Sequence, residues 1–214
     1  YYSIFQLSNK KGLDVMLKSY FAAFKDNPDD VCLVLKTYID PFHGEGDLKK
    51  VKDYITSVKE DVKLAHHPPI LLLTDMLSDL QLYNLHQICD AFVLPSRGEG
   101  WCIPAFDALG FGKIPIATNW GGIREYLSSD NGFPIDYELQ PCWGMPHKNL
   151  YTGHEQWAEP SVASLITQFR TSFDLIKHNT PILQKMREAG KKTVKKFDLK
   201  NHNWNEVFDS LKAN

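Results

Sequence analysis

Short apolar runs alternate with amphipathic stretches along most of the chain. Residues 13–24 carry apolar side chains at helical spacing. Residues 31–35 (VCLVL) form a continuous apolar run, typical of a strand buried on both faces. Similar runs predict further strands at 2–5, 70–73, 91–94, 114–118 and 133–135. Further helices are predicted at 48–58, at 78–88, after Pro104, and at 161–177, 181–196 and 203–211.

This alternation of strands and helices with short links predicts one fold class. It is an α/β fold with a doubly wound parallel sheet, Rossmann-like, joined by right-handed crossovers and closed by C-terminal helices. The segment 136–157 is aromatic and is predicted to be irregular. The sequence contains no internal repeat, so we expect residues 1–214 to form a single domain.

Composition excludes several classes of partner. The hydrophobic fraction of 43% and the charged fraction of 23% are ordinary for a soluble globular protein. The 24 Lys and Arg residues face 26 Asp and Glu residues, which leaves no basic excess for nucleic acid. A basic cluster at 191–196 is interpreted as the solvated end of a helix, with peripheral membrane contact as the alternative.

The cysteines and the apolar runs bear on the compartment. The four cysteines are far apart and match neither a Cys-x-x-Cys nor a zinc spacing, which favours a reducing cytoplasm. No run reaches the roughly 20 apolar residues of a transmembrane helix, and no signal peptide opens the chain. We therefore expect a cytoplasmic protein without a transmembrane segment.

The loop between the strand at 91–94 and the helix after Pro104 carries the candidate chemistry. Glu99 and Asp107 lie on the two sides of this junction, and carboxylates accept charge-assisted hydrogen bonds from the hydroxyls of sugars and ribose. Amides at the start of a helix form a natural seat for a phosphate. The loop therefore predicts a nucleotide-sugar site. In the alternative interpretation, the two acids are merely solvated or favour the start of the helix.

At this point the chain resembles a known family. Residues 96–110 (SRGEGWCIPAFDALG) resemble the signature of the retaining family 4 glycosyltransferases, whose fold is called GT-B. The resemblance extends to GKIPI at 112–116, GGIRE at 121–125, KG at 11–12 and WAEP at 157–160. It covers nearly the whole chain but only the C-terminal, donor-binding half of such enzymes. It implies that the N-terminal, acceptor-binding domain is absent. Tyr1 stands where a chain would begin with Met, so we expect sequence upstream to be missing and the isolated chain to be inactive or nearly so.

The resemblance also implies roles for residues around the loop. Glu99 corresponds to the acid that contacts the donor sugar. Asp107 corresponds to the acid that contacts the ribose, where the family usually has Glu. Cys102 stands where glycine is common, so its side chain narrows the pocket. The turn that would hold the diphosphate or the sugar through backbone amides consists of Gly100, Trp101, Cys102 and Ile103.

The cations and the base pocket follow from the same resemblance. Lys11 corresponds to the lysine that neutralises the diphosphate, so Glu99 and Lys11 are the expected catalytic residues. The second cation of the family, an arginine, is missing because residues 5–6 are Phe-Gln. Arg97 is offered as its substitute, with a solvated rim position as the alternative. Thr74 is expected to border the base. Since Lys11 and the amides can handle the diphosphate, no metal and no cofactor are expected.

The sequence thus predicts the donor-binding domain of a glycosyltransferase of the hexosyltransferase type. It would bind a UDP- or GDP-sugar and transfer the sugar, with retention, to an acceptor that the sequence does not identify (a glycan, a lipid-linked glycan or a protein). Two alternatives stay open at this point. One is a nucleotide-sugar epimerase of the same architecture, and the other is a non-catalytic nucleotide-sugar-binding or scaffold domain.

Overall fold

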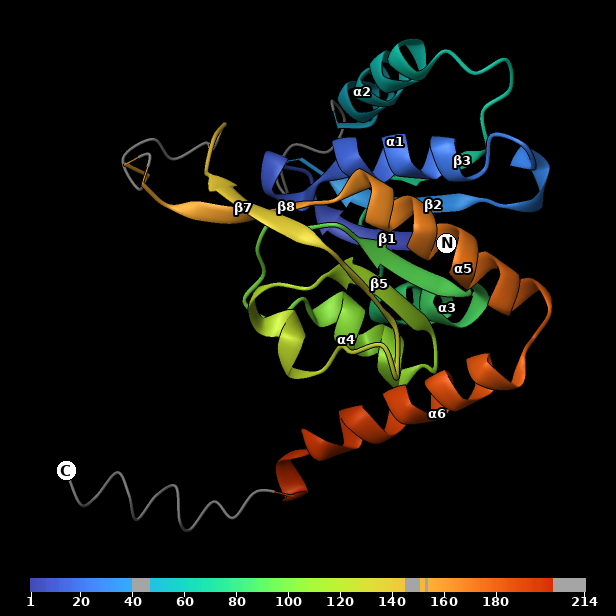
Figure 1. Cartoon of the computed structure of the whole chain (residues 1–214), viewed down its shortest axis with the longest axis vertical. Coiled ribbons are helices and arrows are strands. Elements are labelled where there is room, and N and C mark those ends of the chain that lie inside the picture. The colour runs from blue at the N-terminus through green and yellow to red at the C-terminus, as the bar shows by residue number, and fades with distance from the viewer. Residues whose placement is uncertain (40–46, 145–150, 153, 202–214) are drawn as a thin grey trace.

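Six parallel strands form the centre of the fold (Figure 1). They are β1 (Tyr2–Gln6), β2 (Leu33–Tyr38), β3 (Ile70–Leu73), β4 (Ala91–Leu94), β5 (Ile114–Thr118) and β6 (Phe133–Ile135). Their order in the sheet is β3-β2-β1-β4-β5-β6, and every neighbouring pair is parallel. This computed structural model describes residues 1–39, 47–144, 151–152 and 154–201. The predicted Rossmann-like, doubly wound sheet is confirmed.

Helices cover both faces of the sheet. They are α1 (Leu13–Ala23), α2 (Asp47–Val62), α3 (Asp79–Ile88), α4 (Ile103–Gly110), α5 (Val162–Lys177) and α6 (Pro181–Lys196). Short 3-10 helices are η1 (Asn9–Lys11), η2 (Pro28–Asp30), η4 (Gly121–Glu125) and η6 (Leu199–Asn201). Helix α1 packs against α5 and α2, whereas α4 packs against α6 (Figure 1). None of the helices in the described part of the chain is long and apolar enough to cross a membrane.

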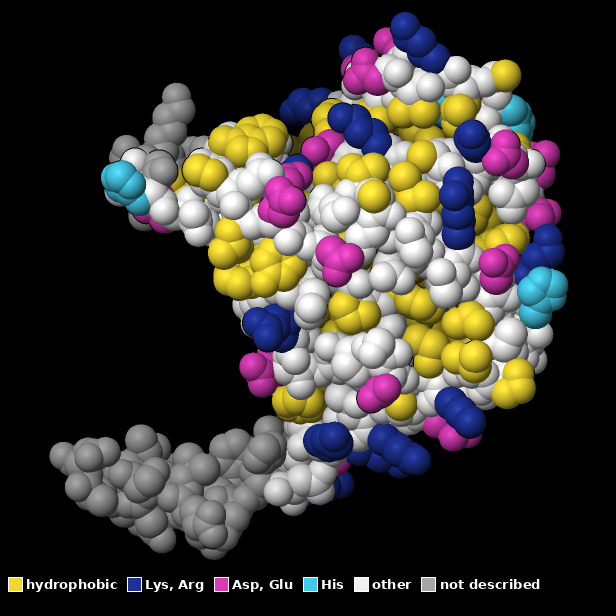
Figure 2. All heavy atoms as spheres, viewed as in Figure 1, with side chains coloured by type: hydrophobic (Ala, Val, Ile, Leu, Met, Phe, Trp, Pro, Cys, Tyr) yellow, Lys and Arg dark blue, Asp and Glu magenta, His cyan; other side chains and the backbone are white. Residues whose placement is uncertain are grey.

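Burial explains why these segments adopt their structure. All residues of the central strands β4 and β5 are buried, as expected of continuous apolar runs in a parallel sheet. Helix α3 begins as predicted at Ser78, whose side chain accepts a hydrogen bond from the backbone of Gln81 in a capping box. On the face shown in Figure 2, basic and acidic side chains are interspersed.

The segment after β6 differs from the prediction. Instead of being irregular at both ends, it forms an antiparallel hairpin of β7 (Tyr137–Pro141) and β8 (Gln156–Pro160). These short strands contain charged residues and proline, so their own propensity is low and pairing between them supplies the order. The helix predicted at 203–211 lies outside the described residues. That residues 1–214 form one domain stays a prediction.

Candidate functional site

The strand order creates a crevice between β1 and β4. From β1 the chain continues to β2 on one side, and from β4 to β5 on the other, so the connections diverge at the carboxyl ends of these two strands. A cavity of about 450 Å³ lies there. Its lining consists of Ile4, Phe5, Gln6, Lys11, Tyr38, Leu94, Glu99, Trp101, Cys102, Ile103 and Pro104. Five of the predicted site residues therefore share one cavity.

An ion pair stands in this cavity. Lys11 Nζ lies 2.6 Å from Glu99 Oε1, and both side chains are largely buried. Gly12 makes this approach possible, since its φ is +66° and a Cβ there would lie 2.0 Å from the carbonyl oxygen of Pro95. Only a glycine lets the start of α1 lie against the end of β4, which brings the predicted cation and the predicted carboxylate together.

The turn before α4 presents unpaired amides. Cys102 caps the helix in the left-handed conformation, with φ 60° and ψ 68°. The Tyr126 hydroxyl lies 2.8 Å from the carbonyl oxygen of Trp101 and 3.2 Å from that of Cys102. In the described part of the chain, no group accepts a hydrogen bond from the backbone N–H of Trp101, Cys102 or Ile103. These amides lie at the positive end of the helix dipole and are available to an anion.

Charges converge on Cys102 from several sides. Burial, with smaller contributions from the carboxylates Glu99 and Asp107, raises the pKa of the Cys102 thiol to about 12, while Lys11 and the Ala105 backbone act in the opposite direction. Burial also raises the pKa of Tyr126 above its ordinary value, and the same two carboxylates add to that shift. Asp107 does not line the cavity and is exposed on α4, although desolvation of its carboxyl raises its pKa. Glu99 thus lines the cavity, whereas Asp107 lies outside its lining, and the role predicted for Asp107 stays a prediction.

A glycine pair supports the loop from behind. The Gly122 N–H donates to the carbonyl oxygen of Glu99 at 3.1 Å. A Cβ on Gly122 would lie 1.8 Å from the carbonyl oxygen of Gly100, and one on Gly121 would lie 2.5 Å from that of Glu99. The start of η4 thus contacts the backbone of the acidic loop directly and fixes its position.

Arg97 does not occupy the position that we expected. It is 1% exposed, so it does not lie at a solvated rim. Its Nη2 lies 2.9 Å from Asp14 Oδ2, its Nε lies 2.6 Å from Glu159 Oε2, and its Nη1 donates to the carbonyl oxygen of Asn9. The prediction of a second free cation beside the diphosphate is therefore wrong, because two carboxylates already neutralise this guanidinium.

Other residues lie at the margins of the cavity or were missed. Thr74 follows β3, two strands away from β1, and is not part of the cavity lining. Gly100 is exposed on the loop. Tyr38 was not predicted, although it lines the cavity from the end of β2, beside Gln6 in the sheet register. The order of the strands, had it been assumed, would have placed the end of β2 at the site.

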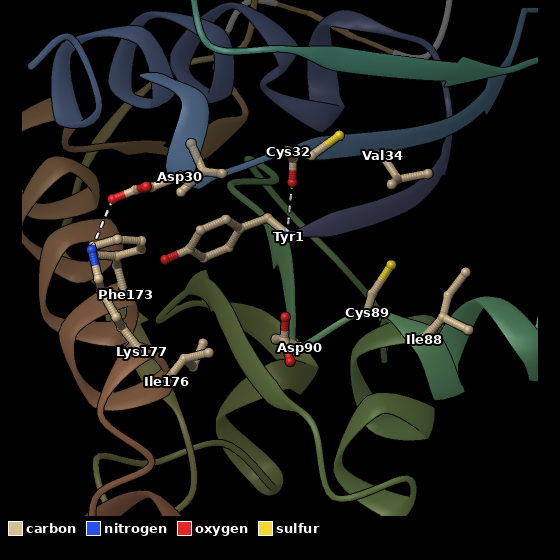
Figure 3. Close-up of a pocket in the computed structure, with 11 residues that line it drawn as sticks. Tyr1, Asp30, Cys32, Val34, Ile88, Cys89, Asp90, Phe173, Ile176 and Lys177 are labelled. Carbon is tan, nitrogen blue, oxygen red and sulfur yellow. Dashed lines mark hydrogen bonds and ion pairs between the residues drawn. The ribbon is translucent and has the colours of Figure 1, made fainter. Parts of the chain in front are cut away.

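A second cavity of about 450 Å³ lies at the opposite edge of the sheet (Figure 3). It opens at the amino ends of β1, β2 and β4 and is lined mainly by apolar side chains, Val34, Ile88 and Ile176 among them. An ion pair of 2.8 Å joins Asp30 and Lys177 at this cavity. Its lining is less suited to a diphosphate than the cavity beside Lys11, because its walls are mainly apolar and no α-helix begins among its lining residues.

No group of three or more His, Cys, Asp or Glu side chains that could hold a metal ion is found among the residues that the structure describes. All four cysteines are free thiols.

Comparisons with known proteins identify the family and the fold. Residues 1–139 match the family described as Glycosyl transferases group 1. A glycogen synthase of Streptococcus pneumoniae is 23% identical over 215 residues, which is 96% of this chain and 37% of that protein. The chain spans between about a quarter and two fifths of the curated glycogen synthases that it matches.

Two solved structures show the same fold. The C-terminal domain of LpcC from Francisella tularensis, a glycosyl transferase group 1 family protein, superposes with a TM-score of 0.61 at 16% identity, covering 92% of this chain and 84% of that one. Anabaena Alr3699/HepE, in complex with UDP and glucose, superposes with a TM-score of 0.61 at 16% identity, covering 100% of this chain and 48% of that one. The chain therefore belongs to the glycosyl transferases group 1 family, and its sheet is the Rossmann-like fold of the C-terminal domain of GT-B glycosyltransferases.

Proposed function

We propose that this chain is the donor-binding domain of a retaining family 4 glycosyltransferase and binds a UDP- or GDP-hexose at the carboxyl edge of its sheet. The observation that carries the proposal is the Lys11–Glu99 pair of 2.6 Å, which shares a cavity with a helix start whose amides are unpaired. This arrangement offers a cation, a carboxylate and N–H donors within reach of one ligand. The family match supports a transferase. The complex of Alr3699/HepE with UDP and glucose favours a uridine nucleotide.

Each part of the donor has a partner in this proposal. The diphosphate receives Lys11 and the amides of residues 101–103, which also stabilise the charge that develops as the diphosphate leaves. Once Lys11 turns to the phosphates, the carboxylate of Glu99 is released to accept hydrogen bonds from the sugar hydroxyls. Asp107, on the exposed side of α4, accepts from the ribose. No step in this scheme uses a metal.

The proposal extends to the acceptor and to the cellular compartment. The chain spans only part of its curated relatives, so the acceptor would be held by chain outside these residues. We expect the activity in the cytoplasm, where free thiols stay reduced.

Calorimetry with UDP, GDP, UDP-glucose and GDP-mannose tests the proposal on a matched pair of lysines. Lys11 and Lys177 are each paired with one carboxylate, at opposite edges of the sheet. We expect K11M to weaken nucleotide binding at least tenfold, because a charge-assisted contact contributes about 1.5–3 kcal/mol. K177M should leave the affinity unchanged. Equal affinities of the two variants would place the nucleotide elsewhere.

The two carboxylates can be distinguished in the same assay. E99Q should weaken the binding of the nucleotide-sugar more than that of the bare nucleoside diphosphate, because the proposed partner of Glu99 is the sugar. D107N should weaken the binding of both ligands to the same extent, because both contain the ribose. The assignment of the two acids fails if these patterns are absent or exchanged.

A further inference from the structure

Arg97 connects three segments around the loop that carries Glu99. It precedes Glu99 by two residues in the loop after β4. Its guanidinium contacts η1 through the carbonyl oxygen of Asn9, α1 through Asp14, and β8 through Glu159. We propose that Arg97 is a positioning residue, which fixes Lys11 and Glu99 relative to each other without touching the donor. The inference rests on the proposed function.

The backbone around Arg97 holds the two loops together as well. The Arg97 N–H donates to the carbonyl oxygen of Lys10 at 2.7 Å, and the Ser96 hydroxyl donates to the same oxygen at 3.1 Å. The residue that follows this carbonyl is Lys11. A shift of the arginine would therefore move the cation and the carboxylate apart, since each lies one or two residues from these contacts.

The surroundings of the guanidinium favour a fixed geometry. The side chain lies over the rings of Trp157 and Trp143, with Cζ 5.0 and 5.7 Å from their centroids. Burial alone would lower the pKa of Arg97, but Glu159 and Asp14 raise it above its ordinary value, so the group stays charged. A buried ion pair adds little net stability over apolar side chains, yet the arginine fork imposes a strict arrangement on its partners. The network is better suited to fixing positions than to stabilising the fold.

The same contacts link the site to the β7–β8 hairpin. The Ala158 N–H donates to the carbonyl oxygen of Arg97 at 2.9 Å, next to Glu159. The side-chain amide of Asn9 donates to the carbonyl oxygen of Gly144 at 3.2 Å. Glu159 does not line the cavity. Its carboxylate should nevertheless influence donor binding, because it holds the residue that holds Glu99.

The test compares two arginines that both contact α1, Arg97 from the loop after β4 and Arg170 from α5. Arg170 donates to the carbonyl oxygens of Ala23 and Ala22, at the far end of α1. In R97K the charge is kept, but a lysine cannot reach all the partners of the planar fork. We expect R97K to weaken binding of UDP or UDP-glucose at least tenfold, and E159Q to weaken it severalfold. The affinity of R170K for the same ligands should stay within twofold of that of the natural chain. Wild-type affinity in both R97K and E159Q would overturn the proposal.

A double-mutant cycle between Arg97 and Lys11 distinguishes a positioning role of Arg97 from a general loss of structure. If Arg97 acts through Lys11, then R97K should cause little further loss of affinity in a K11M background. Fully additive losses would contradict the proposal and indicate a merely structural role.

A second measurement needs no ligand. The coupling between Lys11 and Glu99, obtained from the unfolding midpoints of K11M, E99Q and the double variant, should disappear in an R97K background. If the natural chain binds neither UDP nor GDP, the proposed function fails. The coupling still tests whether Arg97 fixes Lys11 relative to Glu99. Coupling that persists in R97K would refute the positioning role.

Discussion

Gly100 and Gly122 contact each other at the site but differ in what they tolerate. A Cβ on Gly122 would lie 1.8 Å from the carbonyl oxygen of Gly100, whereas a Cβ on Gly100 would meet no atom within 4 Å. We expect G122A to lower the free energy of unfolding by about 1–3 kcal/mol, because the acidic loop must move. G100A should change it by less than about 0.5 kcal/mol. Urea denaturation of the two variants checks this, and equal losses would contradict the close contact.

Cys102 should be unreactive although it lines a cavity. Its thiol is buried and its pKa is raised to about 12, so very little thiolate exists near neutral pH. Cys32 is exposed and serves as the reference within the same molecule. At pH 8 we expect iodoacetamide to label Cys102 at least about a hundredfold more slowly than Cys32. Mass spectrometry of each cysteine against time measures the two rates. Comparable rates would mean that the turn before α4 opens in solution.

For single residues, the sequence predicts site residues that lie in recognisable loops, but it does not reveal contacts between residues that are far apart in the chain. Lys11 and Glu99 belong to recognisable loops after strands, and the structure brings them into contact. Arg97 was misplaced because its partners could not be identified from its own neighbourhood. Asp14 is 83 residues away and Glu159 is 62 residues away. Only the folded chain shows that these carboxylates occupy the guanidinium.

Helix α3 is joined to β1 by a contact between His86 and Tyr2, and the burial of this histidine should make stability depend on pH. The Tyr2 hydroxyl lies 2.6 Å from Nδ1 of His86, which also stacks on Phe111. Burial lowers the pKa of His86 from its ordinary 6.5 to about 4. Between these two values the unfolded chain binds more protons than the folded one. Stability should therefore fall as the pH drops from about 6.5 to 4, by up to about 3 kcal/mol.

The variant H86Q isolates this contribution. Glutamine does not titrate, so the loss of stability between pH 6.5 and 4 should be smaller in H86Q than in the natural chain. The same substitution at the exposed His154 is the control and should preserve the natural slope. Denaturation midpoints measured across this pH range give the slopes. An H86Q slope equal to that of the natural chain would show that His86 does not protonate on unfolding.

Sheet pairing accounts for the elements that were predicted least well. The strand expected at 31–35 lies instead at Leu33–Tyr38, because pairing with β1 continues beyond the apolar run through the buried residues Lys36 and Thr37. The β7–β8 hairpin has the same origin. Its order depends on the partner strand and on the contact of Ala158 with Arg97, neither of which has a local signal. Strands with long apolar runs, such as β4 and β5, were predicted correctly.

The whole molecule has two cavities of similar size at opposite edges of one sheet. Volume alone does not distinguish the two cavities, so the assignment of the nucleotide site depends on their chemistry and on the sheet topology. Each cavity holds a lysine–carboxylate ion pair, but only the carboxyl edge adds the divergent connections of β1 and β4 and, among the described residues, a helix start with unpaired amides. The amino edge offers mainly apolar walls (Figure 3). A nucleoside diphosphate should therefore choose the carboxyl edge.

Isoleucine methyl groups report on this choice directly. Ile4 and Ile103 line the cavity at the carboxyl edge, and Ile88 and Ile176 line the other. With the isoleucine methyls labelled for NMR, titration with UDP or GDP should shift the first pair and leave the second pair in place. The phosphates need N–H donors and a cation, which lie beside the first pair. In K11M, the same shifts should require at least tenfold more nucleotide, because the cation is gone while both cavities keep their shape. Shifts confined to Ile88 and Ile176 would move the binding site to the amino edge and remove the basis for assigning Glu99 and Lys11 to catalysis.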